Sequence, residues 1–245
     1  MARGYREPVE KPRRFYKAVE VVPDDGGGFA VRLDGRPVRT PRGGRLVLPA
    51  RALADQVAEE WAAQGEVLEI PLMHATRLAN TAIESIPGAR AETADAVAGY
   101  AASDLLCYWA EEPAALVERQ AHHWGPVLQW IEAEAKLAFI RAAGIVHQPQ
   151  PQPTLDRVRA MALELDDFGL AGLAFGAALF GSAILAIALQ RGWLDGDQAF
   201  ELSRLDEVWQ AERWGADAEA AERNERLRGE ARMLDRWFRG VGAAG

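Results

Sequence analysis

The feature that most constrains this fold is an uncharged run from Phe168 to Leu189, which lies between two aspartates and Arg191. A segment of roughly 20 apolar residues is long enough to cross a bilayer or to occupy the centre of a helical domain. The run lacks a belt of Trp or Tyr at both ends, and Gly172 and Gly176 suit close helix packing. We therefore predict a buried central helix over 168–190, with membrane attachment through 168–189 as the alternative.

The N-terminal part of the sequence alternates apolar and polar side chains with a period of two. Strands are predicted at 15–22, 29–33, 36–40 and 45–48. Turn-forming residues separate them, including the pair Asp34 and Gly35, which is typical of a tight hairpin. Because Val31 and Leu33 share one face and Arg32 lies on the other, we expect an antiparallel sheet with one buried face and one solvent-exposed face.

The apolar spacing changes after Pro49, because Leu53, Val57 and Trp61 recur at every fourth position. This pattern predicts a helix that ends near Gly65 and covers the sheet, followed by a short strand over 67–70. The pair Pro87-Gly88 is typical of a domain boundary.

Beyond Pro87-Gly88 the pattern is helical to the C-terminal region. Helices are predicted at 90–109, 119–142, 154–166, 168–190, 196–212 and 217–238. Asp195 and Gln198 have the form of a capping box at the start of one of them. The predicted fold class is α+β, with a small N-terminal antiparallel β domain and its covering helix over 1–88 and a larger all-α domain over 89–245.

The composition excludes several classes of function. The 245 residues carry a net charge of −8, with +6 in residues 1–51 and −14 in residues 52–245. An acidic chain of this kind has no general attraction for nucleic acid or anionic lipid. The single cysteine, Cys107, forms no intrachain disulfide, which fits a reducing compartment, and its apolar neighbours predict an inert core thiol.

Motifs for catalysis or cofactor binding are missing from the sequence. His122 and His123 are adjacent on a predicted helix, so they point about 100° apart and do not chelate one metal ion together. The glycine run 26–28 lacks the Lys-Ser/Thr ending of a phosphate loop. We therefore expect no catalytic residue, no metal site and no cofactor.

One acidic side chain lies in an unusual position on the predicted helix 196–212. Leu202, Leu205 and Trp209 form the apolar stripe of this helix, and Asp206 lies at the edge of that stripe. A carboxylate in such a place is half-buried and needs a partner. It either pairs internally, with Arg204 or a residue of a neighbouring helix, or marks a place where the charge of another protein docks.

Short motifs in a fixed order resemble the family of ATP synthase assembly chaperones that act on the alpha subunit of the F-type enzyme's catalytic head. The resemblance runs from about residue 14 to 215. The motifs are Arg14-Phe15-Tyr16-Lys17, Leu33-Asp34-Gly35-Arg36-Pro37-Val38-Arg39-Thr40-Pro41, Glu60-Trp61, Ala79-Asn80-Thr81-Ala82-Ile83, Asp104-Leu105-Leu106-Cys107-Tyr108, Glu111-Glu112-Pro113, Leu116-Val117, Trp124 with Pro126, Ser203-Arg204-Leu205-Asp206-Glu207 and Glu212-Arg213-Trp214-Gly215.

The resemblance implies a protein that binds the unassembled alpha subunit, shields the surface meant for the beta subunit and yields when beta arrives, without nucleotide hydrolysis. The family's functionally important acidic position maps most simply onto Asp206, where the usual residue is Glu, and Glu207 is a second candidate. Trp193, Trp214 and Trp237 are candidate aromatic anchors. The predicted partner-binding residues are Asp206, Glu207 and Trp214.

The remaining expectations concern an alternative function, the oligomeric state and the cellular location of the protein. The alternative function is an enzyme or small-molecule binder with a site between the two domains, because domain junctions favour pockets. We expect a monomer without stable membrane insertion. The absence of an apolar leader run predicts a bacterial cytoplasmic protein, or a mitochondrial matrix protein if the chain is eukaryotic and already processed.

Overall fold

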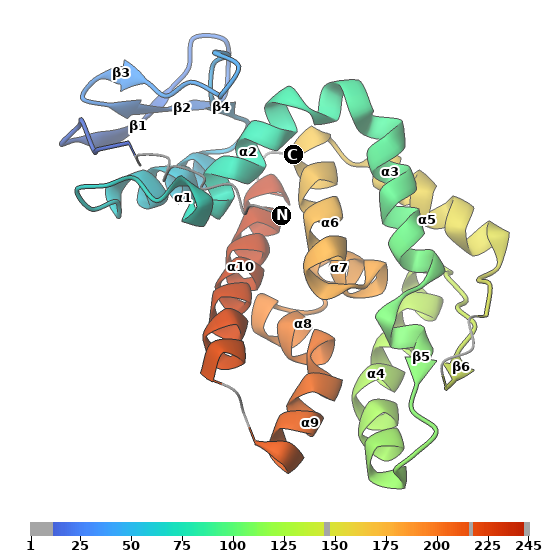
Figure 1. Cartoon of the computed structure of the whole chain (residues 1–245). Helices are drawn as coiled ribbons and strands as arrows, with labels where there is room; N and C mark the ends of the chain where they lie inside the picture. The colour runs from blue at the N-terminus through green and yellow to red at the C-terminus, as the bar shows by residue number, and fades with distance from the viewer. Residues whose placement is uncertain (1–11, 145–147, 216–217, 243–245) are drawn as a thin grey trace, which may run out of the picture.

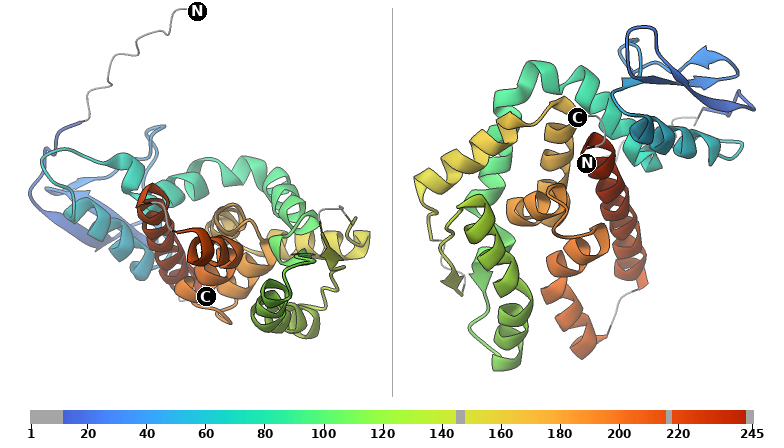
Figure 2. Two further views of the ribbon diagram at one scale, coloured as in Figure 1. Left: turned by 60° about the horizontal axis from the view of Figure 1, so that its bottom comes forward. Right: turned by 180° about the vertical axis from the view of Figure 1, so that it is seen from behind.

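The computed structural model describes residues 12–144, 148–215 and 218–242. It has a small antiparallel sheet followed by a layered array of helices, which confirms the predicted α+β class. Figures 1 and 2 show the sheet at one end of the molecule and α4 and α9 at the other. The strands of the sheet are β1 (Val19–Pro23), β2 (Phe29–Leu33), β3 (Arg36–Pro37) and β4 (Val47–Leu48).

Strand β2 is the centre of this sheet. It pairs with β1 along its whole length and with β3 and β4 over its two halves, always antiparallel. Asp34 and Gly35 both have positive φ, as the predicted hairpin turn requires. The Asp34 carboxylate also accepts hydrogen bonds from the N–H groups of Lys17 and Ala18, at 3.1 and 2.8 Å, and so fixes the start of β1.

The predicted covering helix is confirmed as α1 (Arg51–Ala62), and it packs on the apolar face of the sheet. The hydroxyl of Tyr16 donates a hydrogen bond of 2.6 Å to the carbonyl of Trp61, joining the two layers. The predicted strand over 67–70 is wrong. Val67 forms one bridge with Arg13, and Ile70–Leu72 is instead a short 3-10 turn, because Pro71 has no N–H to give to a sheet.

The rest of the described chain is mainly helical. They are α2 (His74–Glu84), α3 (Ile86–Ala102), α4 (Ala114–Ala135), α5 (Gln152–Glu164), α6 (Asp167–Phe180), α7 (Ala183–Gln190), α8 (Gly196–Ser203), α9 (Leu205–Trp214) and α10 (Ala218–Gly242). A 3-10 turn (Leu105–Cys107) and a two-stranded parallel pair, β5 (Tyr108–Trp109) and β6 (Ala142–Ala143), lie beside α4. Pro87 and Gly88 lie in the first turn of α3, and the division of the chain at residue 88 stays a prediction.

The uncharged run is two buried helices and not one. Gly181 adopts a left-handed conformation after α6, and the Ser182 side chain then caps α7 by accepting the N–H of Leu185. The prediction of a buried centre is correct, and the prediction of a single helix over 168–190 is wrong. Within the described part of the chain, no helix combines the length and hydrophobicity that a membrane crossing needs.

Other predicted helices also differ in their ends. The helix predicted at 90–109 stops at Ala102, and the helix predicted at 119–142 begins at Ala114 and stops at Ala135, where Lys136 takes a left-handed conformation. The helix predicted at 196–212 is interrupted at Arg204, although its capping box of Asp195 and Gln198 is present. The predicted helix 217–238 corresponds to α10, and its first residue lies outside the described residues.

A fully buried carboxylate holds the break between α6 and α7. Asp104 accepts hydrogen bonds from the Ser182 hydroxyl at 2.7 Å, from the Ile184 N–H at 3.0 Å and from the Leu106 N–H at 3.1 Å. Burial raises the pKa of Asp104 to about 6, although these hydrogen bonds oppose the rise. Asp104 therefore joins the end of α3 to the start of α7 at an electrostatic cost near neutral pH.

This electrostatic cost predicts that the free energy of unfolding depends on pH, and that Asp104→Asn removes this dependence. Because the pKa of Asp104 is higher in the folded chain than in the unfolded one, its stabilising contribution is largest below about pH 4 and is lost as the pH rises towards 6. The free energy of unfolding of the wild type, relative to Asp104→Asn, should fall by about 3 kcal/mol over this range and then level off. Urea unfolding at several pH values measures it. A difference that is flat, or that grows with pH, would contradict this role.

Small residues let α10 approach the central helices closely. A Cβ at Gly172 would meet the Phe238 ring at 2.8 Å, and a Cβ at Gly176 would meet Leu234 at 3.0 Å. A Cβ at Gly196, the first residue of α8, would come within 2.4 Å of the carbonyl oxygen of Ala231. The glycine pair of α6 thus serves packing against α10, and Gly196 sets α8 directly on the α10 backbone.

Gly196→Ala should therefore destabilise the protein by about 2 kcal/mol or more, because backbone atoms have to move apart to admit the methyl group. The control is Gly99→Ala in α3, where a Cβ meets nothing within 4 Å and helix propensity predicts a gain of up to about 1 kcal/mol. Denaturant unfolding of both variants gives the comparison. Equal effects of the two substitutions would refute close packing at Gly196.

Candidate partner-binding surface

Helix α9, which carries the three predicted partner-binding residues, has very few buried side chains. Of its ten residues only Leu205 is buried, whereas Val208 is 39% exposed and Trp214 is 77% exposed. We name the outward part of this helix, made of Asp206, Glu207, Val208 and Trp214, the α9 surface. A helix with so little apolar burial depends on polar contacts for its position.

Those polar contacts come from α4. The amide of Gln120 donates a hydrogen bond of 2.8 Å to the Asp206 carboxylate. Arg119 forms two hydrogen bonds with Glu212, at 2.6 and 3.1 Å. One turn further along α4, the indole N–H of Trp124 donates to the carbonyl of Leu202 in α8, at 3.0 Å. Helices α4, α8 and α9 are thus joined by hydrogen bonds at the end of the molecule far from the sheet.

The structure places Asp206 half-buried, as its place at the edge of the apolar stripe predicts. Its internal partner is the neutral amide of Gln120 on the neighbouring helix α4, so the expected pairing with Arg204 is wrong. Arg204 instead pairs with Glu207 at 2.9 Å, because the interruption at Arg204 directs its side chain towards the following turn. Burial raises the pKa of Asp206, the Glu207 carboxylate raises it further, and the Gln120 hydrogen bond acts in the opposite direction.

The three candidate tryptophans lie in different environments. Trp214 ends α9 and is largely exposed, whereas Trp237 is fully buried and donates a hydrogen bond of 3.1 Å to the carbonyl of Phe168. Trp237 is therefore a core residue, and its prediction as an exposed anchor is wrong. Trp193 is 38% exposed and stacks on Trp130, with ring centroids 4.8 Å apart.

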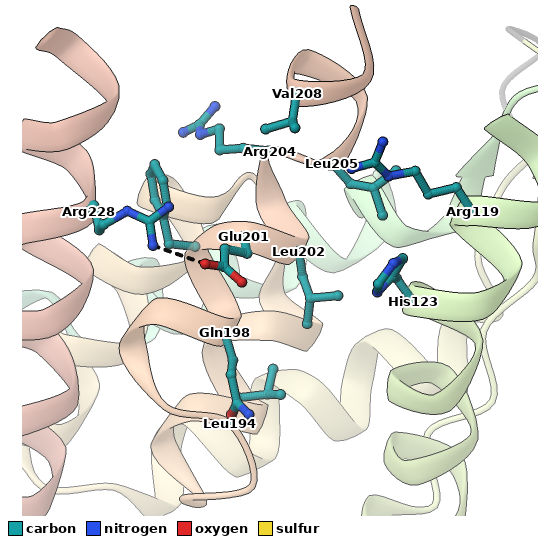
Figure 3. Close-up of a pocket in the computed structure, with 11 residues that line it drawn as sticks. Arg119, His123, Leu194, Gln198, Glu201, Leu202, Arg204, Leu205, Val208 and Arg228 are labelled. Carbon is teal, nitrogen blue, oxygen red and sulfur yellow. Dashed lines mark hydrogen bonds and ion pairs between the residues drawn. The ribbon is translucent and has the colours of Figure 1, made fainter. Parts of the chain in front are cut away.

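A groove of about 480 Å³ lies beside the α9 surface, between α4, α8, α9 and α10. Figure 3 shows its sides, with Arg119 and His123 coming from α4 and Arg228 from α10. Its apolar lining is Leu194, Phe200, Leu202, Leu205 and Val208. The groove thus combines an apolar floor with basic side chains and the carboxylate of Glu201, which pairs with Arg228.

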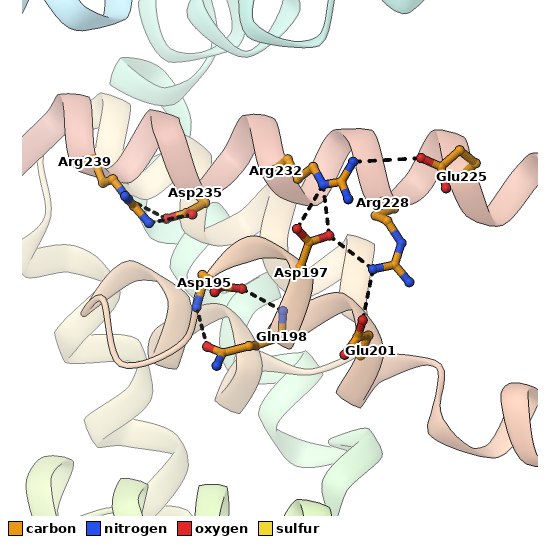
Figure 4. A network of polar contacts seen from close by, with 9 residues as sticks. All are labelled: Asp195, Asp197, Gln198, Glu201, Glu225, Arg228, Arg232, Asp235 and Arg239. Atoms are coloured by element: carbon orange, nitrogen blue, oxygen red, sulfur yellow. Dashed lines mark hydrogen bonds and ion pairs between the residues drawn. The ribbon is translucent and has the colours of Figure 1, made fainter.

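Ion pairs fix α10 against α8 on the far side of this groove (Figure 4). Asp197 pairs with Arg228 at 3.1 Å and with Arg232 at 2.9 Å, and Arg228 also reaches Glu201 at 3.1 Å. The two arginines hold the pKa of Asp197 below its usual range. These contacts and those of Gln120 join residues distant in sequence, which periodicity does not reveal.

The described residues offer no metal-binding cluster of three or more His, Cys, Asp or Glu side chains. Cys107 is buried, and burial together with the Asp104 charge raises the pKa of its thiol, so it is an inert core residue as the sequence predicts.

Comparison with known proteins identifies the family. A family model described as ATP12 chaperone protein matches residues 13–132. The crystal structure of Atp12 from Paracoccus denitrificans is 40% identical in sequence and has a TM-score of 0.85, and the match covers 94% of this chain and 98% of that one. This chain belongs to the ATP12 chaperone family. The family supports a role as an assembly chaperone for the F1-ATPase.

Other ATP12 relatives agree with this assignment. A putative chaperone from Agrobacterium tumefaciens is 40% identical, with a TM-score of 0.88 and coverage of 94% of this chain and 86% of that one. The mitochondrial protein atp12 of Schizosaccharomyces pombe is 25% identical over 88% of this chain and 78% of its own length. Since the family model and the Agrobacterium protein are named as chaperones and not as enzymes, the chain is assigned to the non-enzymatic class.

The link between α4 and α9 makes a prediction about Gln120, which is almost fully buried. Gln120→Leu removes the hydrogen bond to Asp206 and leaves the Ala110 N–H without the acceptor it now has at 2.8 Å. The variant should lose about 1–3 kcal/mol in the free energy of unfolding, and the pKa of Asp206 should rise further. Urea unfolding and a carboxyl NMR titration measure the two effects.

The control is Gln129→Leu, on an exposed position of the same helix, which should change stability by less than about 0.5 kcal/mol. If Gln120→Leu behaves like this control, the hydrogen bonds do not hold α9.

Proposed function

We propose that this chaperone binds the free alpha subunit of the F-type ATP synthase and covers its beta-facing surface until the beta subunit replaces it, without nucleotide hydrolysis. The observation that carries the proposal is the α9 surface. It exposes Trp214 and Val208 next to a half-buried acid, on a helix that adds a single residue to the core. Membership of the ATP12 family supports the assembly role.

The physical chemistry of the α9 surface suits temporary protection. An unassembled subunit exposes an apolar interface, and a protein that binds it lowers the concentration of the aggregation-prone form by mass action. Release by competition requires that this contact be weaker than the final contact between subunits. A small surface with one aromatic side chain and two carboxylates meets that requirement better than a wide apolar one.

Each of the three predicted partner-binding residues has a distinct role in this proposal. Trp214 supplies the apolar anchor, because its indole is already exposed in the free chaperone. Asp206 and Glu207 supply negative charge, which selects a partner surface with basic side chains. Because the Glu207 side chain is 54% exposed, its ion pair with Arg204 can be exchanged for a contact with the client.

The location belongs to the same proposal. Relatives at 40% identity come from two bacteria, and the mitochondrial relative is 25% identical. We propose that the protein works as a monomer in the bacterial cytoplasm, where alpha subunits are synthesised before assembly.

Co-expression with the alpha subunit tests the proposal. Soluble alpha subunit should increase severalfold in the presence of the chaperone, and the double variant Asp206→Lys with Glu207→Lys should lose most of that gain through charge repulsion. Trp214→Ala should weaken binding of the purified alpha subunit roughly tenfold to thirtyfold, as expected for an aromatic hot spot of about 2 kcal/mol. Pull-down and calorimetry measure the two effects.

The matched control reverses the same charges elsewhere, with Asp25→Lys in a loop of the sheet and Glu92→Lys on α3, both exposed. Solubility of the alpha subunit should be unaffected. An Asp-to-Lys mutant of the Paracoccus protein retains a TM-score of 0.84 to this chain, so the fold tolerates one such reversal. An unchanged yield of soluble alpha subunit, with and without the chaperone, would exclude the proposed function.

A further inference from the structure

The groove beside the α9 surface has features that the proposed function does not use. Its floor is formed by Phe200, Leu202 and Leu205, and its mouth opens at Val208, which belongs to the α9 surface. The groove is therefore continuous with the proposed interface. An apolar floor of this kind accepts apolar side chains of a polypeptide laid along it.

Two guanidinium groups face the same aromatic ring in this groove. The Arg228 guanidinium carbon lies 4.9 Å from the centroid of Phe200, and that of Arg204 lies 5.8 Å from it. Figure 3 shows both side chains at one end of the groove, opposite Arg119 and His123. Burial and the neighbours His122 and Arg119 lower the pKa of His123. Among the arginines, Arg228 already pairs with Asp197 and Glu201, and Arg119 pairs with Glu212.

The hydrogen bonds of Arg204 are incomplete. One terminal nitrogen donates to Glu207 at 2.9 Å and the other to the carbonyl of Leu179 at 3.1 Å. The Nε–H group is buried, and within the described part of the chain nothing accepts its hydrogen bond, although the side chain as a whole is 15% exposed. A buried donor without an acceptor is unfavourable, so this nitrogen favours a ligand that brings an acceptor.

We propose that the groove binds an apolar segment of the alpha subunit that carries a carboxylate, with the carboxylate at Arg204 and the apolar side chains on the floor around Phe200. This inference rests on the proposed function, because it names the part of the client that the same end of the chaperone receives. A carboxylate matches the planar guanidinium fork through its Nε and one terminal nitrogen.

The Glu207 carboxylate binds the terminal nitrogen of Arg204 that lies away from the Nε–H edge, and the terminal nitrogen beside Nε donates to the carbonyl of Leu179. The nitrogen beside Nε carries two hydrogens, so it can keep Leu179 and still join Nε in binding a carboxylate. Glu207 then stays on the opposite edge of the guanidinium. The groove and the α9 surface would therefore meet at Arg204, which is the link between them.

Site-specific photo-cross-linking separates this inference from the proposed function. A benzoylphenylalanine residue is placed at His123, which lines the groove from α4 and is exposed, at Trp214 on the α9 surface, or at Ile140, an exposed control position on another part of the molecule. Each full-length chaperone is co-expressed with the alpha subunit and irradiated, and the cross-linked peptide is identified by mass spectrometry. Position 123 should capture an alpha-subunit segment with apolar residues and at least one Asp or Glu, and position 140 should capture none.

Variants of Arg204 then test the carboxylate contact. Arg204→Gln should lower the ratio of cross-linking at 123 to cross-linking at 214 about tenfold, whereas Arg204→Lys, which keeps the charge but not the fork, should lower it less. The ratio corrects for any general loss of affinity, and thermal unfolding shows that each variant is folded.

The possible outcomes have different meanings. Capture of the alpha subunit at 214 but not at 123 would overturn the groove inference and leave the proposed function intact. Failure at both positions would remove the proposed function as well. Capture at 123 of a segment without any carboxylate, or a ratio indifferent to Arg204→Gln, would overturn the assigned ligand chemistry. Thermal stabilisation of the chaperone by a small metabolite bound in the groove would likewise contradict a polypeptide occupant.

Discussion

The hydrogen bonds of Asp104 at the break between α6 and α7 determine much of the helical array. Without a break after Phe180 the uncharged run would continue as one long rod, and α8 and α9 would start in a different place. The carboxylate of Asp104 holds the first turn of α7 through Ser182 and Ile184. Every element after it, including α10 against Gly172 and Gly196, is built on that change of direction.

The centre of this array and its α9 end are stabilised by different forces. The centre is apolar and closely packed, with α10 lying on glycines of α6 and α8. The α9 end is held by an amide, an arginine and an indole of α4, whose hydrogen bonds each contribute modestly in water. Such a division gives a stable body and a surface that can adjust to a client without loss of the fold.

Local signals in the sequence predicted the local structure well. Asp34 and Gly35 specified a hairpin, the spacing of Leu53, Val57 and Trp61 specified α1, and the uncharged run specified a buried centre. The break at Gly181 was missed although glycine followed by serine is a known helix stop and start, because the apolar pattern continues across it.

Long-range contacts were beyond prediction from one sequence. Asp206 was correctly placed at the edge of its helix face, but its partner Gln120 is on a helix distant in the chain, and no periodicity connects the two. Trp237 and Trp214 have similar polar neighbours in sequence, yet one is in the core and the other in solvent. That difference follows from the packing of α10 on α6, which the sequence pattern did not reveal.

The single buried residue of α9 has an evolutionary consequence. Leu205 is the buried residue of this helix and Asp206 and Glu212 bind α4, so the exposed positions between them are under little selection for folding. Substitutions there should accumulate in step with changes on the client, so that each species tunes the pair without rebuilding the scaffold. Leu205 itself should stay aliphatic throughout such drift.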